Sequence, residues 1–114
     1  MKGRKPLKIN CFKLEQRKDK ETGLVKTLNI PILVDFRFDG KRAIYPIGYR
    51  IDIDKWSIET QRVKANNFNK DGIGAGLINQ RINRIAEHLP KIYNDAVDLD
   101  KEISIKYLWS ELTK

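Results

Sequence analysis

The chain has 114 residues, of which 40% are hydrophobic and 33% are charged, so it fits one small domain with a modest core. Its apolar runs are far too short to span a membrane, and its start lacks the apolar region of a signal peptide. The single cysteine, Cys11, excludes a disulfide within the chain and fits a reducing, intracellular setting.

The net charge is +8 and the isoelectric point is near 9.7, which favours a polyanionic partner, most often nucleic acid. The excess is unevenly placed: residues 1–64 hold 16 Lys and Arg against 8 Asp and Glu, whereas residues 65–114 hold 7 of each. The first half is therefore expected to carry a functional basic surface. A solvated basic surface with no partner is the alternative.

The chain begins with a basic segment, residues 1–6, which contains Gly and Pro and is expected to be a flexible arm. Residues 7–16 alternate well enough to predict a strand. Their apolar positions change from odd to even near Phe12, which indicates a bulge. Residues 17–28 have the composition of a charged loop.

Residues 29–48 hold two runs of β-branched and aromatic residues separated by Asp39 and Gly40. An Asp-Gly pair between such runs predicts a two-residue hairpin, because a type I′ turn needs positive φ at both positions. The predicted pairs are Phe38 with Lys41, Phe36 with Ala43, Val34 with Tyr45, and Ile32 with Ile47. Pro31 and Pro46 lack an amide donor, so we expect Pro31 at the start of the central strand and Pro46 on an edge strand.

Alternation gives this hairpin two unlike faces. The apolar face carries Ile32, Val34, Phe36, Ala43, Tyr45 and Ile47. The other face carries Leu33, Asp35, Arg37, Arg42 and Ile44. Arg37 and Arg42 are predicted to lie side by side, where a negatively charged partner would relieve their repulsion. A different loop length would exchange the faces.

The stretch after the hairpin is less regular. Asp54 is expected to cap a single helical turn that brings Trp56 onto the core. Residues 57–76 are predicted to be irregular, with Val63 as a short anchor. Gly72 to Gly76 resemble a phosphate loop only weakly, because no strand directly precedes them and the dinucleotide spacing is incomplete, so a flexible connection is the better interpretation.

A long amphipathic helix is predicted over residues 75–98, because apolar residues recur at steps of four and three. Its stripe consists of Ile78, Ile82, Ile85, Leu89, Ile92, Ala96 and Leu99. Pro90 lies within it and predicts a kink or a short break. Ser104 is the expected N-cap of a short final helix that carries Ile105, Leu108, Trp109 and Leu112.

No catalytic or metal-binding pattern stands out. One cysteine and one histidine cannot form a zinc site without several carboxylates, and Cys11 with His88 lacks a third, orienting group. We therefore expect no catalysis, no metal and no cofactor in this chain.

The segments that carry a resemblance are Asn29-Ile30-Pro31-Ile32, Asp39-Gly40-Lys41-Arg42, Gly48, Ile53-Asp54-Lys55-Trp56, Arg62-Val63-Lys64 and Ile78-Asn79-Gln80-Arg81-Ile82. In this order they resemble the N-terminal arm-type DNA-binding domain of tyrosine recombinases (integrases) from conjugative transposons and related mobile elements, over roughly residues 7–100. The resemblance implies a sheet that enters the major groove of arm-type sites flanking the recombination core. It also implies that residues 101–114 begin the linker to a core-binding domain.

One position departs from the family, which often has Arg where this chain has Asp35. Three interpretations are open: Asp35 reads a cytosine amino group, it forms an ion pair with a neighbouring Arg, or the face assignment is reversed.

The sequence thus predicts an α+β fold, with a three-stranded antiparallel sheet packed on a long C-terminal helix and a short terminal helix. Its predicted function is sequence-specific binding of double-stranded DNA as the non-catalytic N-terminal module of a recombinase. We expect it in the bacterial cytoplasm at the nucleoid, with the rest of the recombinase and other protomers as further partners. The predicted DNA-binding residues are Arg4, Lys5, Lys8, Lys13, Arg17, Arg37, Lys41 and Arg42.

Two other functions compete with this prediction. The apolar seam of residues 78–99 could pair with a partner helix, which would make the chain a protein-interaction module. Alternatively, Phe12 and Tyr45 could stack on RNA bases.

Overall fold

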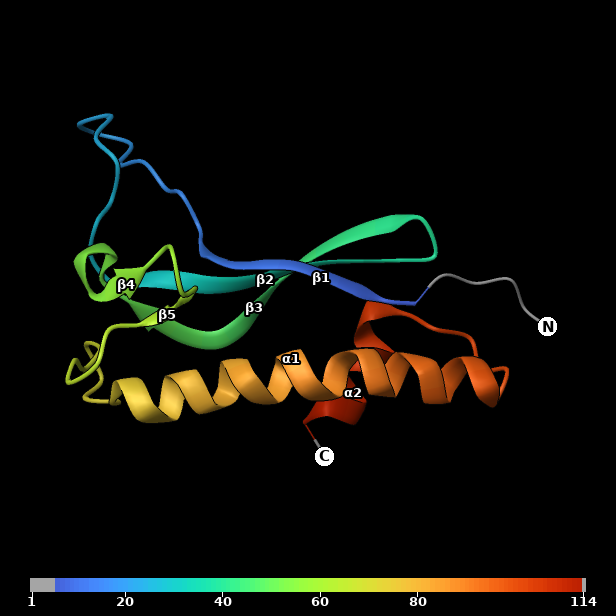
Figure 1. Ribbon diagram of the computed structural model, residues 1–114. Coiled ribbons are helices and arrows are strands. Elements are labelled where there is room, and N and C mark those ends of the chain that lie inside the picture. Colours follow the sequence, from blue (N-terminus) through green and yellow to red (C-terminus); the bar gives the residue numbers. More distant parts are fainter. Residues whose placement is uncertain (1–5, 114) are drawn as a thin grey trace.

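The computed structural model of the chain describes residues 6–113. In chain order its elements are β1 (Lys8–Leu14), β2 (Ile30–Phe38), β3 (Lys41–Ile51), the 3₁₀ turn η1 (Ile53–Lys55), β4 (Trp56–Ser57), β5 (Arg62–Val63), α1 (Ala75–Asp98) and α2 (Ile105–Leu112). β1, β2 and β3 form an antiparallel sheet in that order, and α1 lies along one of its faces (Figure 1). The predicted α+β architecture is confirmed, with β2 central and Pro31 near its start.

The hairpin between β2 and β3 has the predicted turn. Asp39 and Gly40 have φ values of 51° and 73°, and the strands pair in register from Phe38 with Lys41 to Leu33 with Pro46. The predicted pair of Ile32 with Ile47 is wrong, because residues 47–49 of β3 together oppose Ile32 alone. Gly48, with φ of 103°, lies in this irregularity, where its positive φ is accessible without a Cβ. β3 thus has two more residues than β2 in this stretch. Because two is an even number, the alternation of side chains continues in phase, and the two faces of the hairpin carry the predicted residues.

β1 contains the predicted bulge. Ile9 pairs with Phe36 and Cys11 pairs with Asp35, which leaves Asn10 as the additional residue. This change of phase turns Phe12 into the core, where it is buried.

α1 begins and ends where the periodicity predicts. Of the kink or short break predicted at Pro90, the break is absent, because the helix is continuous through this residue. Ile78, Ile82, Ile85 and Leu89 are fully buried. After Leu89 the stripe shifts: Tyr93 is buried in place of Ile92, and Leu99 lies exposed beyond the end of the helix. A strict seven-residue repeat drifts around a helix of 3.6 residues per turn, so the face that meets the sheet moves on by one position.

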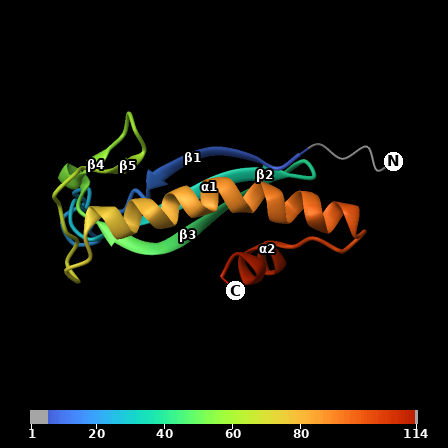
Figure 2. The same cartoon turned by 60° about the horizontal axis from the view of Figure 1, so that its bottom comes forward.

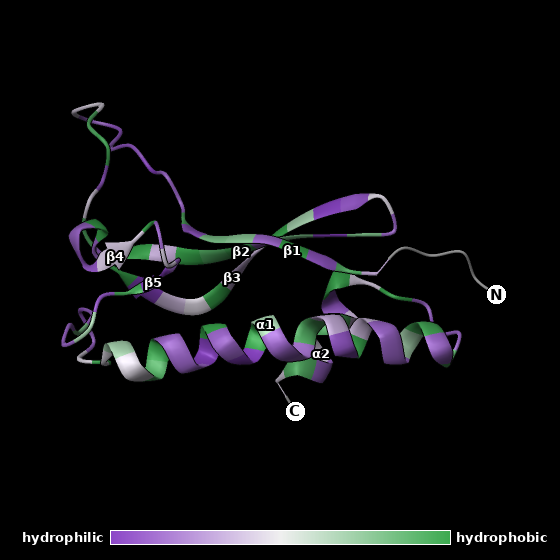
Figure 3. Cartoon of the chain, in the orientation of Figure 1, coloured by the Kyte–Doolittle hydropathy of each residue, from purple (hydrophilic) through white to green (hydrophobic). Residues whose placement is uncertain are grey.

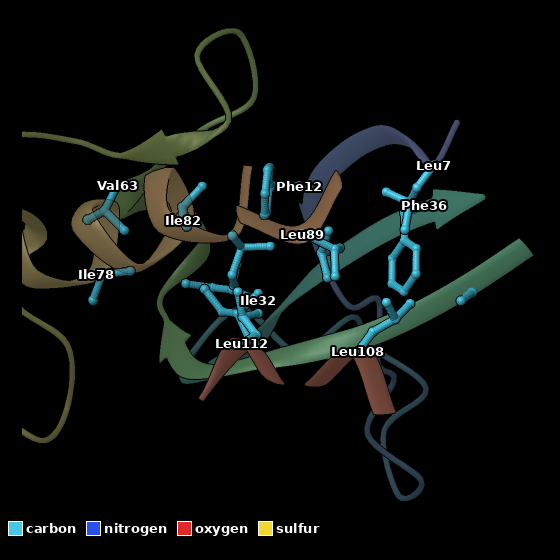
Figure 4. Close-up of a cluster of buried hydrophobic side chains, with 14 of the residues drawn as sticks. Leu7, Phe12, Ile32, Phe36, Val63, Ile78, Ile82, Leu89, Leu108 and Leu112 are labelled. Atoms are coloured by element: carbon cyan, nitrogen blue, oxygen red, sulfur yellow. The ribbon is translucent and has the colours of Figure 1, made fainter. Parts of the chain in front are cut away.

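The core lies between the sheet and α1, and α2 closes one side of it (Figure 2; Figure 4). Leu108 and Leu112 of α2 are buried among the same residues as Ile32 and Phe36. Ser104 caps α2 as predicted, its hydroxyl accepting from the Tyr107 amide at 3.1 Å. Trp109 is half-buried, with its ring centroid 4.5 Å from that of Tyr45.

The segment between the sheet and α1 differs from the prediction. The helical turn is present as η1 and Trp56 is buried, but Asp54 is not its N-cap. Asp52 takes that position, and its carboxylate accepts from the Asn29 amide at 2.8 Å. Strands β4 and β5 were not predicted, because two residues each are too few for alternation to be visible.

Asparagine side chains fix this segment in place. Asn79 of α1 accepts from the Val63 amide at 2.8 Å and donates to the Val63 carbonyl at 2.9 Å, as a neighbouring strand would. The buried Asn69 accepts from the amides of Asp71 and Ile73 and donates to the Arg50 carbonyl. The glycine-rich connection before α1 is therefore a defined turn rather than an unstructured linker.

Candidate nucleic-acid interface

The candidate interface is the face of the three-stranded sheet that points away from α1, here called the open face. Alternation along the paired strands determines which side chains it carries. They are Lys8, Asn10, Cys11 and Lys13 of β1, Pro31, Leu33, Asp35 and Arg37 of β2, and Arg42, Ile44, Pro46 and Arg50 of β3. Cationic side chains gather on the half nearer the hairpin turn, and apolar ones on the other half.

Asp35 is at the centre of the cationic half and is only 3% exposed. Arg42 donates to it from both Nη2, at 2.6 Å, and Nε, at 3.2 Å. Asn10 donates at 3.2 Å, and the Lys13 ammonium lies 3.6 Å away. The carboxylate thus holds side chains from both outer strands. Of the three interpretations of Asp35, the ion pair with a neighbouring Arg is confirmed.

The electrostatics of Asp35 follow from these contacts. The hydrogen bonds from Arg42 are the main cause that lowers the pKa of Asp35 to about 2; Asn10 and the charge of Lys13 act in the same direction, and burial opposes them. The carboxyl is therefore ionised at neutral pH. In turn, Asp35 raises the pKa of Arg42. One negative charge faces two positive ones, so this cluster remains cationic.

Arg37 and Arg42 are direct cross-strand neighbours, as predicted, and both are exposed. Their environments differ. Arg42 has two of its three guanidinium nitrogens on Asp35, whereas no hydrogen bond or ion pair involves Arg37 within residues 6–113. Arg37 is consequently the guanidinium on the open face whose full set of donors is available to a ligand.

The other predicted residues are placed as follows. Arg4 and Lys5 lie outside the described residues. Lys8 is exposed opposite Arg37 on the open face. Arg17 follows β1 and forms an ion pair with Glu15. Lys41 pairs with Phe38, whose ring is buried, so alternation places Lys41 at the turn but on the opposite side from Arg42.

Arg50 is a cation that the sequence prediction missed. It is exposed on β3 opposite Pro31, and its guanidinium donates to the Asn29 carbonyl at 3.4 Å. The prediction ended the hairpin at Gly48, but β3 continues to Ile51. Arg50 could have been predicted from alternation, because it lies an even number of residues after Arg42, Ile44 and Pro46 and so falls on the same face.

The loop between β1 and β2 is a second cationic feature. It rises from the sheet on the side away from α1 (Figure 1), and hydrophilic residues predominate along it and at the hairpin turn (Figure 3). Bonds within it define its shape: Lys18 bridges to Val25, and the Asp19 amide donates to the Leu24 carbonyl at 2.8 Å. The exposed lysines of this loop are Lys18, Lys20 and Lys26.

The structure removes the premises of the two competing functions. Ile78, Ile82, Ile85 and Leu89 are fully buried against the sheet and are not available to a partner helix. For RNA stacking, Phe12 is buried, and Tyr45 packs on Trp109 on the face opposite the candidate interface.

The structure contains neither a Cys–His pair nor a metal site among the described residues. Cys11 lies on the open face, whereas His88 lies on an exposed part of α1, so the two are not brought together. Within the described part of the chain, no group of three or more His, Cys, Asp or Glu side chains could hold a metal ion. Among the same residues, no helix is both long and apolar enough to cross a membrane.

Comparison with known proteins gives one match. No curated protein and no solved structure matches the chain. A family model described as the arm DNA-binding domain matches residues 12–108, which include β2, β3, α1 and only the end of β1. Such a domain is a DNA-binding module without catalysis of its own. The chain, with its basic open face, belongs to the arm DNA-binding domain family.

Proposed function

We propose that the chain binds double-stranded DNA sequence-specifically at arm-type sites, as the N-terminal module of a site-specific tyrosine recombinase. In this proposal the open face enters the major groove, and a domain outside this chain cuts and joins the strands. The rest of the recombinase and other protomers on the DNA are its further partners, in the bacterial cytoplasm at the nucleoid. Residues 101–114 lead toward the core-binding domain.

The observation that carries the proposal is the pair of Arg37 and Arg42 on a face that the packed helix leaves open. A β-ribbon fits the major groove, where an arginine can donate two hydrogen bonds to O6 and N7 of guanine. Arg37 has its donors available for this contact. Arg42 can use the donors that Asp35 leaves open.

The remaining cations are suited to phosphates rather than bases. Lys8, Lys13 and Arg50 lie on the outer strands of the sheet, where the walls of a groove would pass. Phosphate contacts position a protein on the duplex without reading sequence. Arg4 and Lys5 precede β1 and are proposed to reach an adjacent groove.

Selection from a random duplex pool, followed by anisotropy titration of the enriched duplexes, tests the proposal. Arg37→Ala combined with Arg42→Ala should weaken binding at least about fivefold. A matched control is Lys91→Ala with Lys106→Ala, which removes the same charge from exposed positions on α1 and α2. Because Arg42→Ala leaves the Asp35 carboxylate without its main partner, Arg37→Ala alone is measured in parallel, with thermal melting of each variant. The proposal would be contradicted if Arg37→Ala bound as tightly as the wild-type chain and the double arginine variant bound as tightly as the control.

A further inference from the structure

The apolar half of the open face has no explanation in the fold. Ile44 is 45% exposed in the middle of β3, opposite Asp35, and its side chain points away from α1. Leu33 and Pro46 face each other beside it. Because these side chains lie on the opposite side of the sheet from the core, burying them requires a ligand on the open face.

These side chains line a shallow hollow of about 390 Å³. Its apolar lining includes Pro31, Leu33, Ile44 and Pro46, and its charged lining consists of Arg50 and the ion pair of Arg17 with Glu15. The hollow thus combines an apolar lining with one net positive charge, because Glu15 offsets Arg17. A DNA phosphate can bind the positive charge, but it has no apolar surface that could pack against the apolar side chains.

The major groove of DNA presents one apolar group, the C5-methyl of thymine. We propose that Ile44, with Leu33 and Pro46, forms a methyl-reading subsite that selects thymine next to the base contacted by the arginine pair. This inference rests on the proposed binding of DNA by the open face. It adds a specificity determinant that carries no charge.

The strand geometry places this thymine. Ile44 and Arg42 are two residues apart on the same face, which separates them by roughly 7 Å along β3. Successive bases on one strand are about 3.4 Å apart. The thymine should therefore lie within about two base pairs of the base that the arginines contact.

A simpler explanation is that isoleucine occupies position 44 only because β-branched residues favour strands. Threonine keeps the β-branch and one methyl group but has a hydroxyl in place of the ethyl group of isoleucine. Ile44→Thr therefore separates strand propensity from apolar contact. Its exposed position means that folding should be retained, which circular dichroism checks.

The experiment uses the whole chain and duplexes enriched from a random pool. Each thymine in turn is replaced by deoxyuridine, which removes only the methyl group and leaves base pairing intact. At one or two positions the wild-type chain should bind about three- to fivefold more weakly, the effect of losing one buried methyl contact. Ile44→Thr should bind the thymine duplex more weakly and, because it keeps only one methyl group, should respond less than the wild-type chain to deoxyuridine at those positions.

The outcomes separate this inference from the proposed function. If duplexes are enriched and bind, but deoxyuridine changes affinity nowhere, the methyl-reading subsite is overturned while DNA binding stands. An equal response to deoxyuridine in the wild-type chain and in Ile44→Thr overturns it as well. If no duplex is enriched, both ideas fail.

Discussion

The Tyr93 hydroxyl of α1 donates a hydrogen bond to the Asp39 carboxylate at 2.8 Å and so ties the helix to the hairpin turn. The Tyr93 ring also packs edge-on against Phe38, with ring centroids 5.9 Å apart. The turn between β2 and β3, which precedes Lys41 and Arg42, is thus attached to the long helix through both polar and aromatic contacts.

Tyr93→Phe should lower the free energy of unfolding by about 0.5–1.5 kcal/mol, because it removes this hydrogen bond and keeps the ring. Urea denaturation measures the change. Tyr107→Phe, at a half-buried position on α2, is the matched control and should have a smaller effect. If both variants unfold alike, the Tyr93–Asp39 bond does not contribute measurably.

Asp35→Asn should lower the free energy of unfolding at neutral pH by about 1–3 kcal/mol, because it removes the ionised acceptor of the central cluster. A carboxyl with a lowered pKa stabilises the fold above its unfolded pKa, near 4, and this contribution is lost as pH falls through about 2. The difference between the wild-type chain and the variant should thus be constant above about pH 5 and should shrink below pH 4. A difference that grows with acidity would contradict this assignment.

Asn79→Ala should lower the free energy of unfolding by about 1–3 kcal/mol, because the amide and carbonyl of Val63 then lose their partners. Chemical denaturation measures it. Asn94→Ala is the control: it makes the same substitution at an exposed position of the same helix and so corrects for helix propensity. Two variants of equal stability would show that Asn79 does not hold β5.

Replacing Lys18, Lys20 and Lys26 with glutamine should flatten the dependence of DNA affinity on salt. Each phosphate contact contributes about 0.9 to the slope of log K against log salt, so the slope should fall by up to about 2.7 if all three lysines meet phosphates. Anisotropy titrations across a range of salt concentrations measure it. As a control, Lys91, Lys101 and Lys106 are changed to glutamine together, which removes the same charge from α1, α2 and the segment between them. An unchanged slope in the loop variant would exclude this loop from the interface.

The hairpin was predictable because its determinants are local. Asp39 and Gly40 specify the turn, and alternation then specifies the register up to Leu33. The bounds of α1 were predictable for a similar reason, since its periodicity starts and stops sharply. The register beyond Leu33 was not, because the irregularity at Gly48 depends on how β3 curves over the core.

The features that the sequence did not reveal depend on contacts between distant residues. Asn79 and Val63 are 16 residues apart, and neither residue type signals a clamp by itself. At Asp35 the sequence left three possibilities open, because the choice depends on where Asn10 and Lys13 of β1 come to lie. Arg50 was missed because the end of a strand is harder to locate than its middle.

The different environments of Arg37 and Arg42 have a consequence for how recognition can change over time. Arg42 is held before any ligand arrives, so less rotamer entropy is lost on association than for a side chain that must be ordered. A substitution there leaves an ionised carboxylate without its main partner. Replacing Arg37 leaves no buried charge without a partner. We therefore expect variants of this chain to acquire new target sequences through changes at Arg37, while Arg42 stays constant.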